Sequence, residues 1–218
     1  MKRFLHPTCL TLATVFALAL LPACKSAYYG AYEKFGVYKR DLLKKQVVAA
    51  RADQAKASEQ FKDALTKLKE IYAFDGGNLE KQYRELESEY KSSADRAATV
   101  RKSIADVETV GTDLFKEWEQ EIKQITTPSL ADGSRKQLRD TRYRFDQMLD
   151  ALKKSERSMA PVLTKFHDQV LYLKHNLNAS AIASLRGEAT TIQTEISNLI
   201  ADMNTSIAKA DEFIKTMQ

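Results

Sequence analysis

The sequence predicts an all-α protein built from four long helices, and three observations favour this fold class. Apolar residues recur in alternating steps of three and four along most of the chain, as they do on one stripe of a helix. Only 7 Gly and 4 Pro occur among 218 residues, too few for the many turns of a β-sandwich or barrel. With 44% hydrophobic and 29% charged residues, the chain can bury a core but is too charged for a polytopic membrane protein.

Residues 1–23 have the features of a bacterial export signal that is cleaved from the mature chain. Met1-Lys2-Arg3 is positively charged, and a mostly apolar run follows it up to Leu21-Pro22-Ala23-Cys24. This end resembles a lipobox, in which the Cys is lipidated and becomes the first mature residue, although Pro22 departs from the usual small or aliphatic residue. The alternatives are ordinary cleavage near Ala23 and an uncleaved N-terminal anchor. The lipobox resemblance implies that lipid on Cys24 attaches the protein to a membrane.

The lipoprotein resemblance also implies a location. Lys25 follows Cys24, whereas an Asp at that position is the usual inner-membrane retention signal in enterobacteria. We therefore expect an exported protein on the periplasmic face of the outer membrane. Loss of the leader removes Lys2 and Arg3, so the formal net charge falls from +5 to about +3. It also removes Cys9, which leaves Cys24 as the only mature Cys and excludes an internal disulfide.

The first two expected helices cover residues 28–72 and 79–125. Gly76-Gly77 ends the first, and Asn78 can cap the second. The stripe of the first helix consists of Leu43, Val47, Ala50, Gln54, Ala57, Phe61, Ala64, Leu68 and Ile71. That of the second consists of Leu79, Tyr83, Leu86, Tyr90, Ser93, Ala97, Val100, Ile104, Val107, Gly111, Leu114 and Trp118, and continues one place later with Ile122 and Ile125.

The other two expected helices cover residues 134–175 and 180–217. Pro128 and Gly133 mark the break before the third helix, and 175–180 is the break before the fourth. Pro161 predicts a kink within the third helix, or alternatively the start of a separate helix. The third stripe is Leu138, Phe145, Leu149, Leu152, Met159, Leu163, Phe166, Val170 and Leu173, with Arg142 and Glu156 on the same seam. The fourth is Ile182, Leu185, Ala189, Ile192, Ile196, Leu199, Met203, Ser206, Ala210, Phe213 and Met217.

Four segments of similar length with short connections predict a single domain, residues 24–218, folded as an up-down-up-down bundle. Two coiled-coil-like hairpins that form a homodimer through their stripes are the alternative. In the bundle, the loop at Phe74 and the loop at His175 lie at the end far from the membrane. The loop at Pro128 and the C-terminus lie at the other end.

Two stretches carry a family resemblance. YYGAYEKFGVYKRDLLKKQVVAARADQAKASEQFKDAL (28–65) and FHDQVLYLKHNLNASAIASLRGE (166–188) resemble a bacterial envelope family called domain of unknown function 2959, over nearly all of the mature chain. The resemblance implies a signal-bearing, helical, envelope-located protein. It implies no activity, cofactor or catalytic residue.

Motifs that carry enzyme chemistry do not occur. Gly30 and Gly36 lack the spacing of a phosphate-binding loop, and the sequence contains no H-E-x-x-H, G-x-S-x-G or C-x-x-C. His167 and His175 are separated by about 12 Å along a helix axis, too far to share one metal ion. We therefore expect a protein that is not an enzyme and that binds no cofactor and no metal.

Basic residues cluster early in the third helix, at Arg135, Lys136, Arg139, Arg142 and Arg144. A charge of about +3 on an exported chain argues against nucleic-acid binding. Anionic lipid, lipopolysaccharide or an acidic partner fits better, and an ordinary solvated face is the alternative.

A group of aromatic and basic residues follows the lipid site. Tyr28 and Tyr32 share one helical face with Tyr29 beside them, and Lys39 and Arg40 come next. Aromatic rings followed by positive charge suit a membrane interface with anionic headgroups. In the alternative interpretation, these rings close the bundle core.

The far loops form the candidate binding tip, made of Phe74, Asp75, His175, Asn176 and Asn178, since loops held by a stiff scaffold often carry recognition. Alternatively, Phe74 closes the end of the bundle and the Asn residues cap helices. The sequence thus favours a lipid-anchored component of the Gram-negative envelope that binds or scaffolds an envelope protein. A sensor or carrier with a small-ligand or lipid site among the helices is the alternative.

Overall fold

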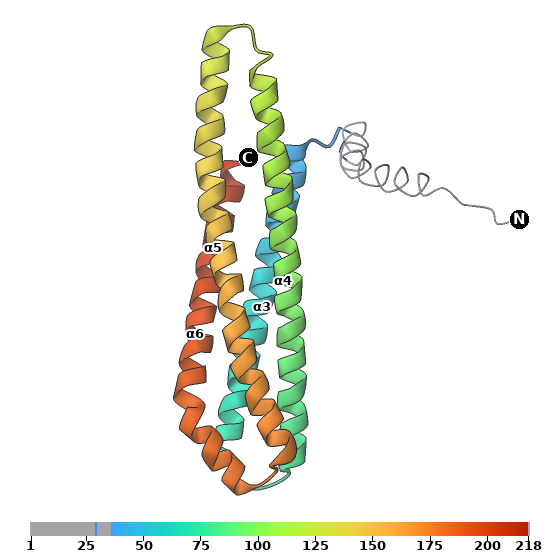
Figure 1. Cartoon of the computed structure of the whole chain (residues 1–218), viewed down its shortest axis with the longest axis vertical. Coiled ribbons are helices and arrows are strands. Elements are labelled where there is room, and N and C mark those ends of the chain that lie inside the picture. Colours follow the sequence, from blue (N-terminus) through green and yellow to red (C-terminus); the bar gives the residue numbers. More distant parts are fainter. Residues whose placement is uncertain (1–28, 30–35, 218) are drawn as a thin grey trace, which may run out of the picture. The chain divides into compact units, whose positions relative to one another are not determined.

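The computed structural model describes Tyr29 and residues 36–217. It divides after Leu42 into two compact units. Helix α3 (Lys39–Tyr72) crosses this division, and α4 (Leu79–Ile122), α5 (Pro128–His175) and α6 (Ala179–Thr216) belong to the second unit. The second unit is an antiparallel four-helix bundle (Figure 1). The predicted all-α fold with four long helices is confirmed.

Within the second unit, α5 packs closely against both α4 and α6. Side chains of α3 reach each of the other three helices. Lys67 Nζ lies 2.7 Å from Glu85 Oε2 on α4, and Gln54 Nε2 donates to Ser155 Oγ on α5 at 2.7 Å. The Arg51 guanidinium forms two hydrogen bonds with the Asp211 carboxylate on α6, at 3.0 and 3.2 Å. All four helices therefore belong to one bundle within a single chain.

The bundle core is formed by the predicted stripes. All nine residues of the α3 stripe are fully buried, as are most of those on α6. The α4 stripe shifts earlier than predicted, because Phe115 is buried while Leu114 and Trp118 are half-buried. On α5, Val162 takes the buried place expected for Leu163. The heptad pattern thus identifies the core with one-residue errors.

The helices differ in length more than the sequence suggested. α4 and α5 have 44 and 48 residues, against 34 for α3 and 38 for α6. Figure 1 shows the α4–α5 hairpin running on past the C-terminal end of α6. The contacts of Gln60 with Glu89 and of Lys67 with Glu85 place Leu43 level with roughly Val107. α4 therefore continues beyond Leu43 for about 22 Å.

Two predicted helix starts are wrong. α3 begins at Lys39 rather than at residue 28, because Gly36 adopts φ +74°, a left-handed conformation that interrupts a helix. Residues 28 and 30–35 lie outside the described part of the chain. α5 begins at Pro128 rather than at residue 134. Proline suits the first helical position, and Gly133 inside the helix costs only about 1 kcal/mol relative to Ala.

Helix α5 passes through Pro161 without interruption. The alternative of a separate helix starting there is therefore rejected. Figure 1 shows the lower part of α5 inclined to its upper part.

Candidate functional site

The two far loops meet at one end of the second unit, which we call the loop end (residues 73–78 and 176–178). The side chain of Asn78 accepts from the Lys81 N–H at 2.9 Å, and that of Asn178 from the Ala181 N–H at 3.0 Å. Each Asn thus caps the helix that follows it. Asn176 Nδ2 donates to the carbonyl of Tyr172 at 2.8 Å, at the end of α5. Both Asn residues of the predicted tip serve to end or start helices.

Arg186 on α6 fastens the α3–α4 loop in place. Its Nε donates to the carbonyl of Tyr72, and its Nη2 donates to the carbonyl of Phe74 at 2.9 Å. The Tyr72 carbonyl is in the last turn of α3 and that of Phe74 just follows it, where the helix itself supplies no N–H donor. The guanidinium therefore holds the loop that carries Phe74 against the start of α6. No pattern in the sequence predicts this role, because Arg186 reads only as one surface charge among many.

Tyr72 forms a second tie at the loop end. Its hydroxyl donates to Gln169 Oε1 on α5 at 2.6 Å, and both side chains are buried. Burial raises the pKa of Tyr72 to about 12. The folded protein therefore favours the protonated phenol.

This shift predicts a loss of stability at high pH. Unfolded Tyr has a pKa of about 10, so below that pH the phenol is protonated in both states and the full stability is present. As the pH rises from about 10 to about 12, the unfolded state ionises first, and the free energy of unfolding falls by about 2 kcal/mol from this group. Denaturant titrations should show this loss in the wild type and in Tyr143→Phe, whose phenol is exposed. Tyr72→Phe should lack this part of the decline, and an identical decline in all three proteins would contradict the assignment.

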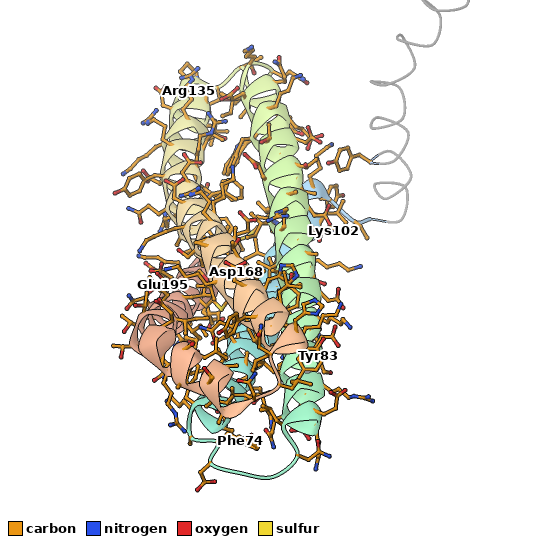
Figure 2. The ribbon with its side chains drawn as sticks, turned by 60° about the horizontal axis from the view of Figure 1, so that its bottom comes forward. Phe74, Tyr83, Lys102, Arg135, Asp168 and Glu195 are labelled. Atoms are coloured by element: carbon orange, nitrogen blue, oxygen red, sulfur yellow. The ribbon has the colours of Figure 1, made fainter. Side chains whose placement is uncertain are left out.

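The remaining predicted tip residues differ in exposure. Phe74 is half-buried, and its ring lies 3.9 Å from the position that a Cβ on Gly77 would occupy. Asp75 and His175 are exposed. Figure 2 shows Phe74 in the loop at this end of the bundle. The geometry brings the predicted residues together, with Phe74 partly covering the end of the bundle.

An exposed apolar surface at the loop end was missed by sequence reasoning. Leu171, Tyr172 and Leu177 are 43%, 41% and 38% exposed, and all three lie within seven residues. We call them the apolar tip surface. Isolated exposed apolar residues are ordinary, whereas a group at one end of a rigid element is typical of interaction sites. A signal was available, since four consecutive apolar residues from Val170 to Leu173 cannot all face one core.

Two of the five predicted interface residues, Tyr28 and Tyr32, lie outside the described part of the chain, as does the predicted lipidation site Cys24. Tyr29 is buried, and the Lys39 ammonium lies 4.6 Å from the centre of its ring, a cation–π contact within the first unit. Arg40 is exposed.

The basic cluster of α5 is divided by its contacts. Arg142 pairs with Glu119 at 2.7 Å and lies 5.0 Å above the Phe115 ring, so it packs along the α4–α5 seam. Arg144 Nε donates to the carbonyl of Asp140 at 3.2 Å. Arg135 pairs with Asp132, and Lys136 and Arg139 are exposed with no ion pair among the described residues. Glu156, the other predicted seam charge, pairs with Arg101 at 2.7 Å.

Several buried polar atoms in the core have no hydrogen-bond partner among the described residues. They are Gln54 Oε1, Ser58 Oγ and Ser93 Oγ. Ser58 also lines an open groove of about 450 Å³ beside α3, together with Lys56, Glu59 and Arg96. Among the described residues, no three His, Cys, Asp or Glu side chains are grouped so that they could hold a metal ion. None of the described helices has an apolar stretch sufficient to cross a membrane.

Comparison with known families identifies the chain. The model of the family described as protein of unknown function (DUF2959) matches residues 28–217, which is most of the chain. No curated protein and no solved structure matches the chain significantly.

Proposed function

We propose that this chain, which belongs to the DUF2959 family, is a lipid-anchored scaffold of the Gram-negative envelope. Its loop end is presented to a protein partner. Lipid on Cys24 holds the chain to the periplasmic face of the outer membrane. The proposal assigns no catalytic step, cofactor or nucleic acid to the chain.

The observation that carries the proposal is the construction of the loop end. Arg186 and the Tyr72–Gln169 hydrogen bond hold both loops in a fixed arrangement. The apolar tip surface is exposed beside them. A preorganised apolar surface loses little conformational entropy on binding, which favours recognition by a protein surface. The α5 helix is about 72 Å long, so the loop end lies far from the start of α5 at the opposite end.

In-cell photo-crosslinking tests the proposal. A photoreactive amino acid at Tyr172 should form an adduct with one recurrent envelope protein, identified by mass spectrometry. The matched control is Tyr143, also an exposed Tyr on α5 but far from the loop end, which should not capture that protein. The further change Leu177→Lys should reduce the Tyr172 adduct. An identical set of adducts from both positions, or none from Tyr172 in a folded and exported protein, would contradict the proposed role.

A small-ligand carrier is the second candidate, because the unpaired polar atoms of Gln54, Ser58 and Ser93 lie in the bundle core. Such atoms are the groups with which a bound ligand could form hydrogen bonds. Native mass spectrometry of the protein purified from its own membranes distinguishes the two roles. If the protein is a carrier, a ligand of constant mass should copurify with the wild type and be absent from Gln54→Met. If it is a scaffold, the spectrum should show only the mass of the chain and its lipid.

A further inference from the structure

The end of the second unit opposite the loop end is formed by the projecting α4–α5 hairpin. We call its last part, residues 123–139, the hairpin end. Figure 2 shows Arg135 here, on the first turns of α5. Its exposed basic residues are Lys123, Arg135, Lys136 and Arg139, and its one acidic residue is Asp132. This part of the chain therefore carries a formal charge of about +3, the same as the whole mature chain.

The directions of the two helices separate basic from acidic side chains. In any α-helix the Cα–Cβ bonds tilt toward the N-terminus. α5 begins at the hairpin end, so Arg135, Lys136 and Arg139 lean toward that end. α4 finishes there, so Glu119 and Glu121 lean away from it, and Glu119 is further drawn to Arg142. The exposed extremity of the hairpin is thus more positive than the composition of its two helices indicates.

An exposed apolar side chain lies at the same end of the hairpin. Leu130, in the first turn of α5, is 63% exposed. Because Lys136 and Arg139 have no ion pair among the described residues, their charges are available to an external anion. An exposed leucine and unpaired basic side chains at the same end of the hairpin suit the headgroup region of an anionic bilayer, where the apolar group enters the interface and the charges meet phosphates.

The length of chain between the lipid and the bundle permits this contact. α3 enters the second unit at Leu43, and α4 continues past that level for about 22 Å. The 19 peptide units from Cys24 to Leu43 can extend to at most about 65 Å. A membrane that holds the lipid of Cys24 is therefore within reach of the hairpin end.

We infer that the hairpin end is a second membrane contact, in which Lys136, Arg139 and Arg135 bind anionic phospholipid headgroups and Leu130 enters the interface. This inference rests on the proposed lipid anchor. Two contacts, the lipid and the hairpin end, hold the bundle upright on the membrane and direct the loop end away from it. One lipid attachment alone leaves the orientation of a bundle free.

Fluorescence of the full lipidated chain in vesicles tests the inference. Leu130→Cys carries an environment-sensitive dye, and Asp75→Cys at the loop end is the matched control. The vesicles contain phosphatidylethanolamine and phosphatidylglycerol, or phosphatidylcholine alone. We expect a blue shift and protection from aqueous iodide only for the Leu130 label and only in anionic vesicles. High salt should reverse both effects, because it screens exposed charges.

Charge reversal provides the second arm. Lys136→Glu combined with Arg139→Glu should lower the fraction of chains whose hairpin end contacts the anionic vesicle about tenfold or more. Lys136→Gln with Arg139→Gln is the milder variant, and Lys69→Glu with Lys174→Glu at the loop end is the matched control that should change nothing. Vesicle flotation is measured in every sample. A chain that fails to float contradicts the proposed anchor, whereas a chain with both basic residues intact that floats with anionic vesicles while its Leu130 label stays in water overturns this inference alone.

Discussion

Gly111→Ala is expected to lower the free energy of unfolding by about 1–2 kcal/mol, although Ala favours a helix over Gly. The reason is the Phe145 ring, whose Cζ lies 2.2 Å from the position that the new Cβ would occupy. The ring cannot move freely, since it packs edge-to-face against Phe115 and Phe213 with centroids 5.2 and 5.8 Å apart. Thermal and urea denaturation measure the change.

Gly187→Ala is the matched control for Gly111→Ala. Gly187 also lies inside a helix, but a Cβ there meets nothing within 4 Å. This change should raise the free energy of unfolding by about 1 kcal/mol through helix propensity alone. Phe145→Leu should cost less in the Gly111→Ala background than in the wild type, by about 1 kcal/mol, because the two sites share one space. Stabilisation by both Gly→Ala changes would show that the ring does not need the glycine.

Gln54→Met is expected to raise the free energy of unfolding by about 1–3 kcal/mol. Gln54 is fully buried, and its Oε1 has no partner among the described residues. Its Nε2 donates to Ser155 Oγ at 2.7 Å, but Ser155 also donates to the carbonyl of Leu152 at 2.9 Å and keeps that bond after the change. An unbranched apolar side chain of similar length thus removes a desolvation cost without leaving Ser155 unpaired.

The control for Gln54→Met is Gln60→Met on the same helix. Gln60 is half-buried, and its Nε2 donates to Glu89 Oε2 at 2.6 Å. Gln60→Met should therefore not raise the free energy of unfolding. Denaturant midpoints at constant m-value measure both changes. A loss of stability in Gln54→Met equal to that in Gln60→Met would show that the amide is fully paired in solution. That result would favour the carrier, in which the Gln54 amide has a second partner.

Much of the fold was predictable because helical periodicity records burial directly. The stripe from Leu43 to Ile71 keeps its steps of three and four, and each of its members is fully buried. The shift of the α4 stripe at Gly111 was not predictable from α4 alone. α4 has 44 residues against 34 for α3, and near its end its buried face turns toward α5, where Phe115 packs against Phe145. Such a change depends on where another helix begins.

The predicted start of α5 was wrong because local signals of loop and helix overlap there. Pro128, Asp132 and Gly133 suggest a loop when read together, yet proline is favourable at a helix start and one glycine is tolerated within a long helix. The consequence was large. The six additional residues of α5, together with the late start of α3, produce the projecting hairpin that equal helix lengths did not suggest.

The candidate site was predicted only in part. The topology correctly brought the loops of Phe74 and His175 to one end, since the number of helices determines which loops share an end. The roles of Asn78 and Asn178 as caps followed from local chemistry. The contacts of Arg186 depend on the axial offset between α3 and α6. The apolar repeat within one helix does not predict that offset. Leu171 and Tyr172 were not recognised as exposed, because they belong to the apolar run from Val170 to Leu173. The four residues of that run cannot all lie on one helical face.

The intact mass of the mature protein, extracted from the membranes of its native host, decides whether lipid on Cys24 anchors the chain. The account predicts a chain that begins at Cys24 and is heavier than its polypeptide by a diacylglyceryl group and one further acyl chain. Cys24→Ser should lose that added mass and leave the membrane in a salt wash. A chain that keeps residues 1–23, or one cut after Ala23 with no lipid, would contradict the claim that this bundle is held at the envelope by lipid on Cys24.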